Sequence, residues 1–338
     1  MKIAIIKPTE SPEPTGGVKV QGKMWKQGLE ELGHEVDLID FWNDYNWNSF
    51  DVVIVLQFGG MFRTMVPLIR KLAKKLVLAP IIDTNLSHFK YKIITKYWGC
   101  QKYLGLTSRF HDMYLNRNLF DLYLARSEYE ASYIEQCLEI PRNRIAIVPL
   151  SIRTAFNNEF PQKEHFCFHA SRLAAKNKNV ERLIRAAQKY KFQLVLAGFL
   201  NGEIEQKWLN DLMNESENIK YVGTLTNEEL LQYYQRAKVF ALPSIMEGVG
   251  MVALEAASNG CEIVLTDKGA PKDYFQGQAY LVNPFSIDDI GQKIQEALNR
   301  GNHQPNLMKF AQENYSMMNC SKKLVQALES CIKKIKTT

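Results

Sequence analysis

Short apolar runs alternate with amphipathic segments along the whole chain. The runs are about four to eight residues long and rich in Val, Ile and Leu, which is typical of strands buried within a parallel sheet. Between them, segments such as 179–190 and 226–237 repeat apolar residues at helical spacing, and the second opens with a Thr226/Glu229 capping box. This alternation predicts sheets built from strand–helix–strand units. The expected strands are 2–6, 35–40, 51–58, 75–82, 122–126, 144–149, 166–171, 192–198, 219–225, 238–244, 261–266 and 279–284.

The series of strands is interrupted once and then begins again. Periodicity disappears over residues 151–163, with six expected strands on each side. The predicted fold class is therefore α/β, with two doubly wound Rossmann-like domains, residues 1–155 and 156–317, facing across a cleft. A last amphipathic helix is expected over 318–336, where it can pack back onto the first domain. Open parallel sheets bind ligands beyond the carboxyl ends of their strands, so a site is expected in those loops.

Composition excludes several classes of protein. The chain has 338 residues and an ordinary apolar content, and its six cysteines show neither a C-x-x-C pair nor zinc-ligand spacing. No apolar run reaches membrane-spanning length, and the first residues have too few apolar side chains for a secretory signal peptide. We therefore expect a cytoplasmic protein without a bound metal ion.

Lysines and aromatic residues are concentrated between residues 70 and 109, although the net charge of the chain is only +6. The simplest interpretation is a solvated helical face. A second interpretation is a surface that meets anionic lipid headgroups, which would make the protein peripheral at the inner face of the membrane. Nucleic acid is not an expected partner, because no recognised binding module accompanies the basic stretch. The aromatic residues are Tyr91, Tyr97, Trp98 and Tyr103.

The strongest chemical pattern is the stretch EGVGMVALE, residues 247–255, which follows an expected strand. Gly248 and Gly250 allow the backbone to approach a ligand closely, and the amides after them would lie at a helix N-terminus, where phosphate binds well. Glu247 and Glu255 stand at the two ends of this stretch. Carboxylates are repelled by phosphate but accept hydrogen bonds from hydroxyls. The pattern therefore favours a ligand with both groups, such as a nucleotide sugar.

The same stretch also fits G-x-G-x-x-A, and Asp267 follows at the end of the next strand, as in the dinucleotide-binding fingerprint. Two features disfavour that interpretation. Residues 245–247 separate the strand from the first glycine, and the motif opens the fourth unit of its domain instead of the first. Nicotinamide binding is therefore only a minor alternative.

Cations for an anionic ligand are available in the loop after the first strand of the second domain. This loop carries Arg172, Lys176 and Lys178, of which Arg172 and one of the two lysines would face the ligand. Basic residues near a helix N-terminus are repelled by the helix dipole. Their presence therefore indicates that the loop binds an anionic ligand and is not merely solvated.

Together these motifs resemble the family-4 retaining glycosyltransferases, which have two Rossmann-like domains in the GT-B arrangement. Residues 247–275 resemble the E-x7-E segment of that family, E-G-F-G-L-x-x-x-E-A-M-A-x-G, and residues 170–184 resemble its G-R-L-x-x-x-K-N segment. Residues 124–134 and 145–156 resemble the end of its first domain, and residues 14–20 its first glycine loop. The resemblance covers nearly the whole chain.

The resemblance implies a role for each motif residue of the second domain. Glu247 would contact hydroxyls of the donor sugar and Glu255 would hold the ribose. Arg172 and Lys178 would neutralise the diphosphate, which the glycine turn and the helix N-terminus would also bind. The residues of this turn and N-terminus are Gly248, Gly250, Met251 and Val252.

For the first domain, the resemblance implies that Gly16 and Gly17 come close to the diphosphate and the acceptor. It also implies a histidine near the reacting sugar carbon. His88 matches that position best, and His111 and His169 are its rivals.

The chain departs from the family pattern at several positions. The lysine stands one residue further from Arg172 than usual, so Lys176 competes with Lys178 for its role. Val249 replaces an aromatic residue and Asp273 a glutamate, and the segment around residue 150 lacks N-G-V-D. Because of these departures, the resemblance does not identify the donor sugar.

The implied activity is that of a nucleotide-sugar-dependent hexosyltransferase in polysaccharide or glycoconjugate synthesis. It would transfer a sugar with retention to a hydroxyl of a saccharide or lipid-linked acceptor. No cofactor is expected besides the nucleotide-sugar co-substrate, and the lack of a D-x-D motif favours a metal-independent mechanism. The alternatives from other classes are a nucleotide-sugar epimerase on the same scaffold and a non-catalytic nucleotide-sugar-binding protein.

Overall fold

A computed structural model describes residues 1–7, 17–57, 62–98, 108–153, 159–214 and 216–333. The chain divides into two compact units. Unit 1 comprises residues 1–151 with 317–338, and unit 2 comprises residues 152–316. The division thus falls between Ser151 and Ile152, whereas the sequence placed it between residues 155 and 156.

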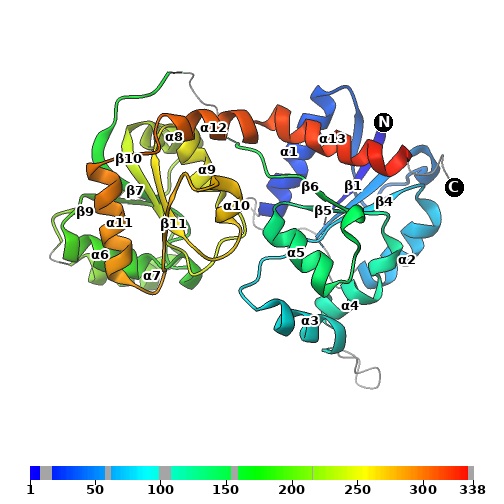
Figure 1. The fold of residues 1–338 in the computed structure, drawn as a ribbon, viewed down its shortest axis with the longest axis horizontal. Helices are drawn as coiled ribbons and strands as arrows, with labels where there is room; N and C mark the ends of the chain where they lie inside the picture. The colour runs from blue at the N-terminus through cyan, green and yellow to red at the C-terminus, as the bar shows by residue number, and fades with distance from the viewer. Residues whose placement is uncertain (8–16, 58–61, 99–107, 154–158, 215, 334–338) are drawn as a thin grey trace. The chain divides into compact units, whose positions relative to one another are not determined.

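Unit 1 is built on a six-stranded parallel sheet (Figure 1). Its strands are β1 (Lys2–Ile6), β2 (Glu35–Leu38), β3 (Val52–Leu56), β4 (Leu76–Ala79), β5 (Leu122–Ala125) and β6 (Ile145–Ile147), in the spatial order β2-β1-β3-β4-β5-β6. Every residue of β3 and β4 is buried, because helices cover both faces of the sheet. In the register of the first pair, Ile3 of β1 lies opposite Val52 of β3.

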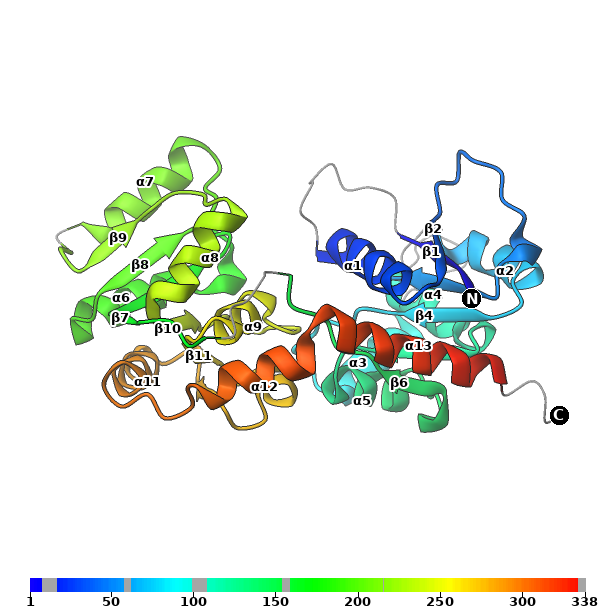
Figure 2. The same ribbon diagram turned by 90° about the horizontal axis from the view of Figure 1, so that it is seen from above.

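The helices of unit 1 are α1 (Gly17–Glu31), α2 (Phe62–Leu72), α3 (His88–Tyr97), α4 (Arg109–Leu115), α5 (Glu128–Cys137) and α13 (Met317–Lys333). Side chains of α1 and α13, such as Trp25 and Leu324, pack on one face of the sheet, and those of α2 to α5 pack on the other. Figure 2 shows α13 alongside α1. The two helices approach closely at Gly28, where a Cβ atom would lie 2.0 Å from the hydroxyl oxygen of Ser321.

Unit 2 is built on a second six-stranded parallel sheet. Its strands are β7 (Glu164–Ala170), β8 (Leu194–Ala197), β9 (Ile219–Tyr221), β10 (Ala237–Leu242), β11 (Glu262–Thr266) and β12 (Tyr280–Val282), in the order β12-β11-β10-β7-β8-β9. Because β7 and β10 are neighbours, the loops that follow them begin side by side at the carboxyl end of the sheet.

The helices of unit 2 are α6 (Val180–Tyr190), α7 (Gly202–Met213), α8 (Asn227–Arg236), α9 (Met251–Ser258), α10 (Pro271–Phe275), α11 (Ile287–Asn299) and α12 (Asn306–Tyr315). Helices α6, α7 and α11 pack their apolar side chains on one face of the sheet. Helices α8 and α9 contact strands of the sheet, and α12 packs on α9. The capping box at the start of α8 is confirmed, since Thr226 and Glu229 each accept a hydrogen bond from the backbone amide of the other.

The predicted α/β class with two Rossmann-like domains is confirmed, because both parallel sheets and their flanking helices are present. Each strand expected from an apolar run is found among the described residues, with ends that differ by a few positions. In this same part of the chain no helix is long and apolar enough to cross a bilayer.

Candidate functional site

Two loops of unit 2 meet at the carboxyl end of the sheet. The loop after β7 contains Lys178, and the loop after β10 contains Glu247. The ammonium nitrogen of Lys178 donates to Oε1 of Glu247 over 2.7 Å, and the hydroxyl of Ser244 donates to the same oxygen over 2.5 Å. A cation and a carboxylate that stand 69 positions apart in the sequence are therefore held together.

The side chain of Lys178 is oriented by the backbone and contacts of the next residue, Asn179. Asn179 has a left-handed backbone with φ of 60°, and its side-chain amide donates to the carbonyl oxygens of Pro243 over 2.8 Å and Pro284 over 2.6 Å. These bonds hold the loop beside the end of β10. Lys178 thereby reaches the Glu247 carboxylate, whereas the rival Lys176 is exposed and lines a neighbouring groove.

The backbone of Glu247 is held by the loop after β11. Its amide donates to the carbonyl of Lys268 over 3.2 Å, and its carbonyl accepts from the amide of Ala270 over 3.2 Å. Gly269 lies between these two residues with φ of 96°, and a Cβ atom there would stand 1.9 Å from the carbonyl oxygen of Glu247. Only glycine fits this position, both in backbone conformation and in space.

Helix α9 begins where the glycine pattern predicts. Gly250 is its N-terminal cap residue with φ of 76°, a left-handed conformation that favours glycine. No described side chain caps this end, so the amides of Met251 and Val252 have no acceptor within the helix. Gly248 precedes them as a half-buried loop residue. A helix N-terminus with free amides is suited to an anion.

Glu255, one turn further along α9, forms an ion pair that the sequence did not predict. Its carboxylate is fully buried and accepts two hydrogen bonds from the guanidinium of Arg153, one from Nε and one from Nη2 over 3.0 Å. Burial and the nearby Glu255 carboxylate hold the pKa of Tyr234 well above its usual range. Arg153 lies in the segment that lacks N-G-V-D. That departure from the family pattern is the one feature of the sequence that draws attention to this residue.

Arg172 is placed differently from Lys178. Its side chain is exposed and forms no hydrogen bond or ion pair with other side chains in the described part of the chain, although its backbone carbonyl accepts from the amide of Ala175 over 3.0 Å. The same strand end holds His169, which is completely buried: Nδ1 lies 2.7 Å from the carbonyl oxygen of Ala241 and Nε2 lies 2.7 Å from the hydroxyl of Ser171. Burial lowers the pKa of His169 to about 4. His169 is therefore a core residue.

The other two candidate histidines, His88 and His111, lie in unit 1. His88 begins α3; its Nε2 lies 2.8 Å from the hydroxyl of Ser132, and its ring stacks on Tyr133 at 4.1 Å between centroids. His111 is buried, with Nδ1 3.2 Å from the carbonyl oxygen of Thr95. His88 is thus more accessible than its two rivals, and its assignment near the sugar remains a prediction.

Of the glycine pair expected near the diphosphate, Gly16 lies outside the described residues. Gly17 is the first residue of α1 and is exposed, and no atom of the described residues beyond its chain neighbours lies within 4 Å of the position that a Cβ would occupy. The role of Gly17 near the diphosphate stays a prediction.

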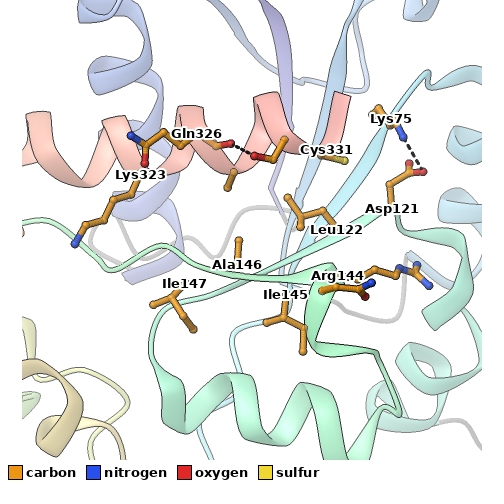
Figure 3. A pocket seen from close by; sticks show the side chains of 13 residues that line it. Lys75, Asp121, Leu122, Arg144, Ile145, Ala146, Ile147, Lys323, Gln326 and Cys331 are labelled. Carbon is orange, nitrogen blue, oxygen red and sulfur yellow. Dashed lines mark hydrogen bonds and ion pairs between the residues drawn. The ribbon is translucent and has the colours of Figure 1, made fainter. Parts of the chain in front are cut away.

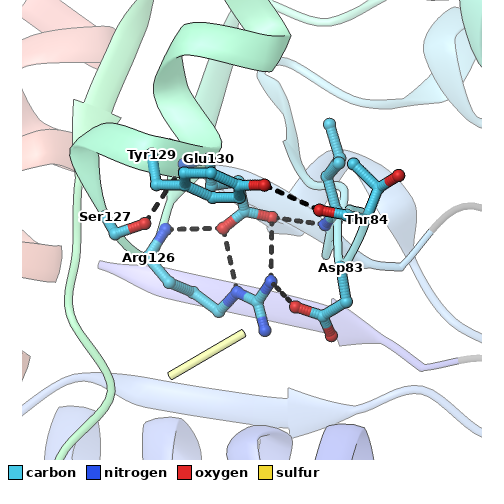
Figure 4. Close-up of polar contacts among 7 residues, drawn as sticks. Asp83, Thr84, Arg126, Ser127, Tyr129 and Glu130 are labelled. Carbon is cyan, nitrogen blue, oxygen red and sulfur yellow. Dashed lines mark hydrogen bonds and ion pairs between the residues drawn. The ribbon is translucent and has the colours of Figure 1, made fainter. Parts of the chain in front are cut away.

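A polar network in unit 1 was missed by the sequence analysis (Figure 4). Arg126, directly after β5, donates from Nε to Glu130 over 2.9 Å and from Nη2 to Asp83 over 2.8 Å. Glu130 also accepts from the amide of Ile82 over 2.6 Å, which ties the ends of β4 and β5 together. The S-x-x-E spacing of Ser127 and Glu130 indicates a helix start but not this network.

Two hollows of several hundred cubic ångströms are formed by described residues, one in each unit, and the one in unit 2 borders the loop of Lys178. One of about 400 Å³ lies between β6 and α13 in unit 1, where Lys75, Asp121 and Lys323 are among the lining residues (Figure 3). The other, of about 550 Å³, lies in unit 2 near the starts of α6 and α7. Among the described residues, no group of three or more His, Cys, Asp or Glu side chains is arranged to hold a metal ion.

Residues 152–314 match the family model of glycosyl transferases group 1. This segment contains both loops of the site and all of α9. O-antigen chain mannosyltransferase B of Escherichia coli is 25% identical to the chain over 195 residues, which are 52% of this chain and 51% of that protein. The chain therefore aligns with about half the length of this relative.

Solved structures are similar in fold to nearly the whole chain, including the part that precedes the group 1 segment. Sucrose-phosphate synthase from Thermosynechococcus elongatus matches at a TM-score of 0.74 and 15% identity, over 98% of this chain and 99% of that one. Anabaena HepE in complex with UDP-glucose matches at 0.68 and 14% identity, over 98% and 100%. These likenesses show that both units have the Rossmann-like folds of GT-B proteins.

Proposed function

We propose that the chain is a hexosyltransferase that uses a nucleoside-diphosphate sugar and needs no metal ion. It transfers the sugar with retention to a hydroxyl of a saccharide or lipid-linked acceptor, in polysaccharide or glycoconjugate synthesis. The observation that carries this proposal is the contact between Lys178 and Glu247 in the same group 1 segment as the uncapped N-terminus of α9. The similarity to an O-antigen mannosyltransferase and the fold likeness to a protein bound to UDP-glucose support it.

Different residues would bind the charged diphosphate and the hydroxyls of the donor. The diphosphate would bind at the N-terminus of α9 and near Lys178, because free amides and an ammonium group both favour phosphate oxygens. Glu247 would accept hydrogen bonds from hydroxyls of the sugar. Glu255 would do the same for the ribose, and Arg172, exposed on the loop after β7, would reach the diphosphate from solvent.

In the transfer step, the bond between the anomeric carbon and the phosphate oxygen breaks while the acceptor oxygen bonds to that carbon. The diphosphate leaves with the electron pair of the broken bond, and its departing oxygen takes up the proton that the acceptor hydroxyl loses. Lys178 and the α9 amides would stabilise the negative charge that grows on the leaving group, as fixed donors do in a preorganised site. His88 would lie next to the anomeric carbon of the sugar.

The replacement Glu247→Gln tests this proposal. It keeps the shape of the side chain but removes the charge that lies beside the reacting sugar, so kcat should fall about 100-fold or more. Binding of nucleoside diphosphate, measured by calorimetric titration, should change little. The matched control is Glu164→Gln, which breaks an exposed ion pair with Arg236 elsewhere in unit 2 and should leave kcat unchanged.

The assay compares several donors, including GDP-mannose and UDP-glucose, with and without acceptor and with excess chelator. Transfer that survives chelation and fails in Glu247→Gln is the expected result. Conversion of the donor to a new nucleotide sugar without any acceptor would indicate an epimerase instead. Tight donor binding with no turnover of any donor would indicate a binding protein.

A further inference from the structure

Helix α3 carries an apolar stripe on its solvent-facing side. Phe89, Ile93 and Tyr97 follow one another at intervals of four residues and so lie on one side of the helix, and Trp98 stands at its C-terminal end. Between 41% and 73% of the surface of each of these four residues is exposed. Three large apolar residues in one exposed row, with a fourth at the end of the helix, need an explanation, because scattered single ones do not form such a patch.

The stripe does not arise from a poorly anchored helix. The opposite side of α3 is packed into unit 1, with Tyr91 and Thr95 buried. The ring of Tyr91 meets those of Phe110 at 5.6 Å and Tyr133 at 5.3 Å. Ser87 caps the N-terminus by accepting from the amide of Lys90. The exposed row is therefore a separate feature of a helix that already contributes one face to the core.

Lysines stand on both sides of the stripe. At the angular spacing of an α-helix, Lys90 lies on one side, and Lys92 and Lys96 lie on the other. Lys92 and Lys96 share a single carboxylate, that of Glu139, at 3.1 Å and 3.3 Å. No acidic residue occurs within α3 itself. The surroundings of the stripe therefore carry an excess of positive charge.

We infer that the outer face of α3 docks onto the headgroup region of an anionic lipid bilayer. Aromatic and aliphatic side chains flanked by lysines are the composition of helices that lie in a membrane interface, with the apolar side chains in the acyl boundary and the ammonium groups at the phosphates. The stripe is about 12 Å long from Phe89 to Tyr97, since each of the eight steps between them rises 1.5 Å.

Charge decides between a bilayer and a protein partner. Three aromatic residues and one isoleucine, each partly covered, present on the order of 500 Å² of apolar surface, the size of a patch that marks an interaction site. The lysines beside the stripe outnumber the carboxylate that pairs with them, and an anionic bilayer attracts basic residues at every point of its surface without needing a matching acidic patch. This inference goes beyond the proposed function and does not depend on it.

The test is co-sedimentation of the full chain with vesicles of phosphatidylcholine alone or with a quarter of phosphatidylglycerol. Binding is expected to the anionic vesicles only and should decrease as salt rises. Lys90→Gln should lower the partition coefficient roughly fivefold, the factor equivalent to about 1 kcal/mol for one basic residue near the surface. The triple variant Phe89→Ser, Ile93→Ser, Tyr97→Ser should lower it at least about tenfold.

Matched controls are Trp42→Ser, which removes another exposed aromatic residue of unit 1, and Lys309→Gln, which removes an exposed lysine of unit 2. Both should bind like the unaltered chain. Equal thermal unfolding of all variants shows that they are folded. As a second readout, brominated lipid should quench tryptophan fluorescence in the unaltered chain more than in Trp98→Phe.

Three results would overturn the inference. They are equal binding to neutral and anionic vesicles or binding to neither, unchanged binding of the triple variant, and a lipid-free dimer that the triple variant abolishes. The last result would assign the stripe to a second copy of the chain. No donor or acceptor is present in these assays, so their failure would leave the proposed sugar transfer untouched.

Discussion

The ion pair between Arg153 and Glu255 connects the first residues of unit 2 to α9. The side chain of Glu255 is 0% exposed, whereas 39% of the side chain of Arg153 is exposed. Two guanidinium nitrogens bind the two carboxylate oxygens. The buried Glu255 carboxylate is thus neutralised by the partly exposed guanidinium of Arg153. Unit 2 should depend on this contact for its stability.

The replacement Arg153→Ala removes the one cation that the described part of the chain places on this carboxylate. Loss of one partner from a fully buried ion pair destabilises a protein by about 3–5 kcal/mol. Water enters the space left by the partly exposed Arg153, so we expect about 2 kcal/mol, or a Tm lower by roughly 4–8 °C for a unit of this size. In a double-mutant cycle with Glu255→Gln, the coupling free energy should be about 1.5 kcal/mol.

The matched control is the ion pair between Arg236 and Glu164 in the same unit. It has the same two-point geometry, at 2.6 Å and 3.1 Å, but its side chains are 54% and 52% exposed. Its coupling free energy should stay below about 1 kcal/mol. Both cycles are measured by urea unfolding. An equal or larger coupling in the exposed pair would refute the argument that burial sets the strength of the contact.

The same variant has a consequence for the proposed donor. If ribose hydroxyls take the place of Arg153 at Glu255, the donor must first break a contact of about 1.5 kcal/mol, which lowers its affinity about tenfold. Arg153→Ala should therefore bind nucleoside diphosphate about tenfold more tightly in a calorimetric titration, at a temperature where it is folded. Weaker binding would show that the guanidinium itself holds the ligand.

Three other predictions follow from the geometry of unit 2. Lys178→Ala should raise the Kd of nucleoside diphosphate at least about tenfold and Lys176→Ala much less, and the reverse order in calorimetry would exchange their roles. Gly269→Ala should destabilise the protein by more than about 2 kcal/mol and lower kcat, whereas Gly277→Ala, with a similar φ but open space around it, should cost about 1 kcal/mol in urea unfolding. The pKa of His169 is lowered to about 4, so the unfolded chain takes up its proton first, and stability should fall by up to about 3 kcal/mol between pH 6.5 and 4. A pH dependence identical to that of His169→Gln would contradict this last prediction.

The strands could be predicted because their signal is local. Each is an apolar run, and in a parallel sheet with covered faces even adjacent positions are buried, as β11 shows with five buried residues. The start of α9 could also be predicted, because the left-handed conformation of Gly250 favours glycine and the apolar pattern of the helix begins after it. Local sequence contains both signals in full.

The contacts of the site could not be predicted in the same way. Arg153 and Glu255 stand 102 positions apart, and no spacing rule relates an arginine outside any expected element to a helical glutamate. The choice of Lys178 over Lys176 depends on the left-handed turn at Asn179 and on the two carbonyls that its side chain contacts. Such choices follow from which strands are neighbours, and apolar periodicity alone does not reveal strand order.

The two glutamates of the E-x7-E motif share one feature: each is paired with a cation from a different loop, Glu247 with Lys178 and Glu255 with Arg153. A ligand that carried only phosphates would draw the cations away and leave buried carboxylates unpaired, and a ligand that carried only hydroxyls would do the reverse. Either outcome is unfavourable in a buried site. A nucleotide sugar supplies phosphates for Lys178 and hydroxyls for the two carboxylates, and the partly exposed Arg153 returns to water, so no charge stays buried without a partner. The paired charges themselves thus favour a ligand that combines both groups over either of its parts.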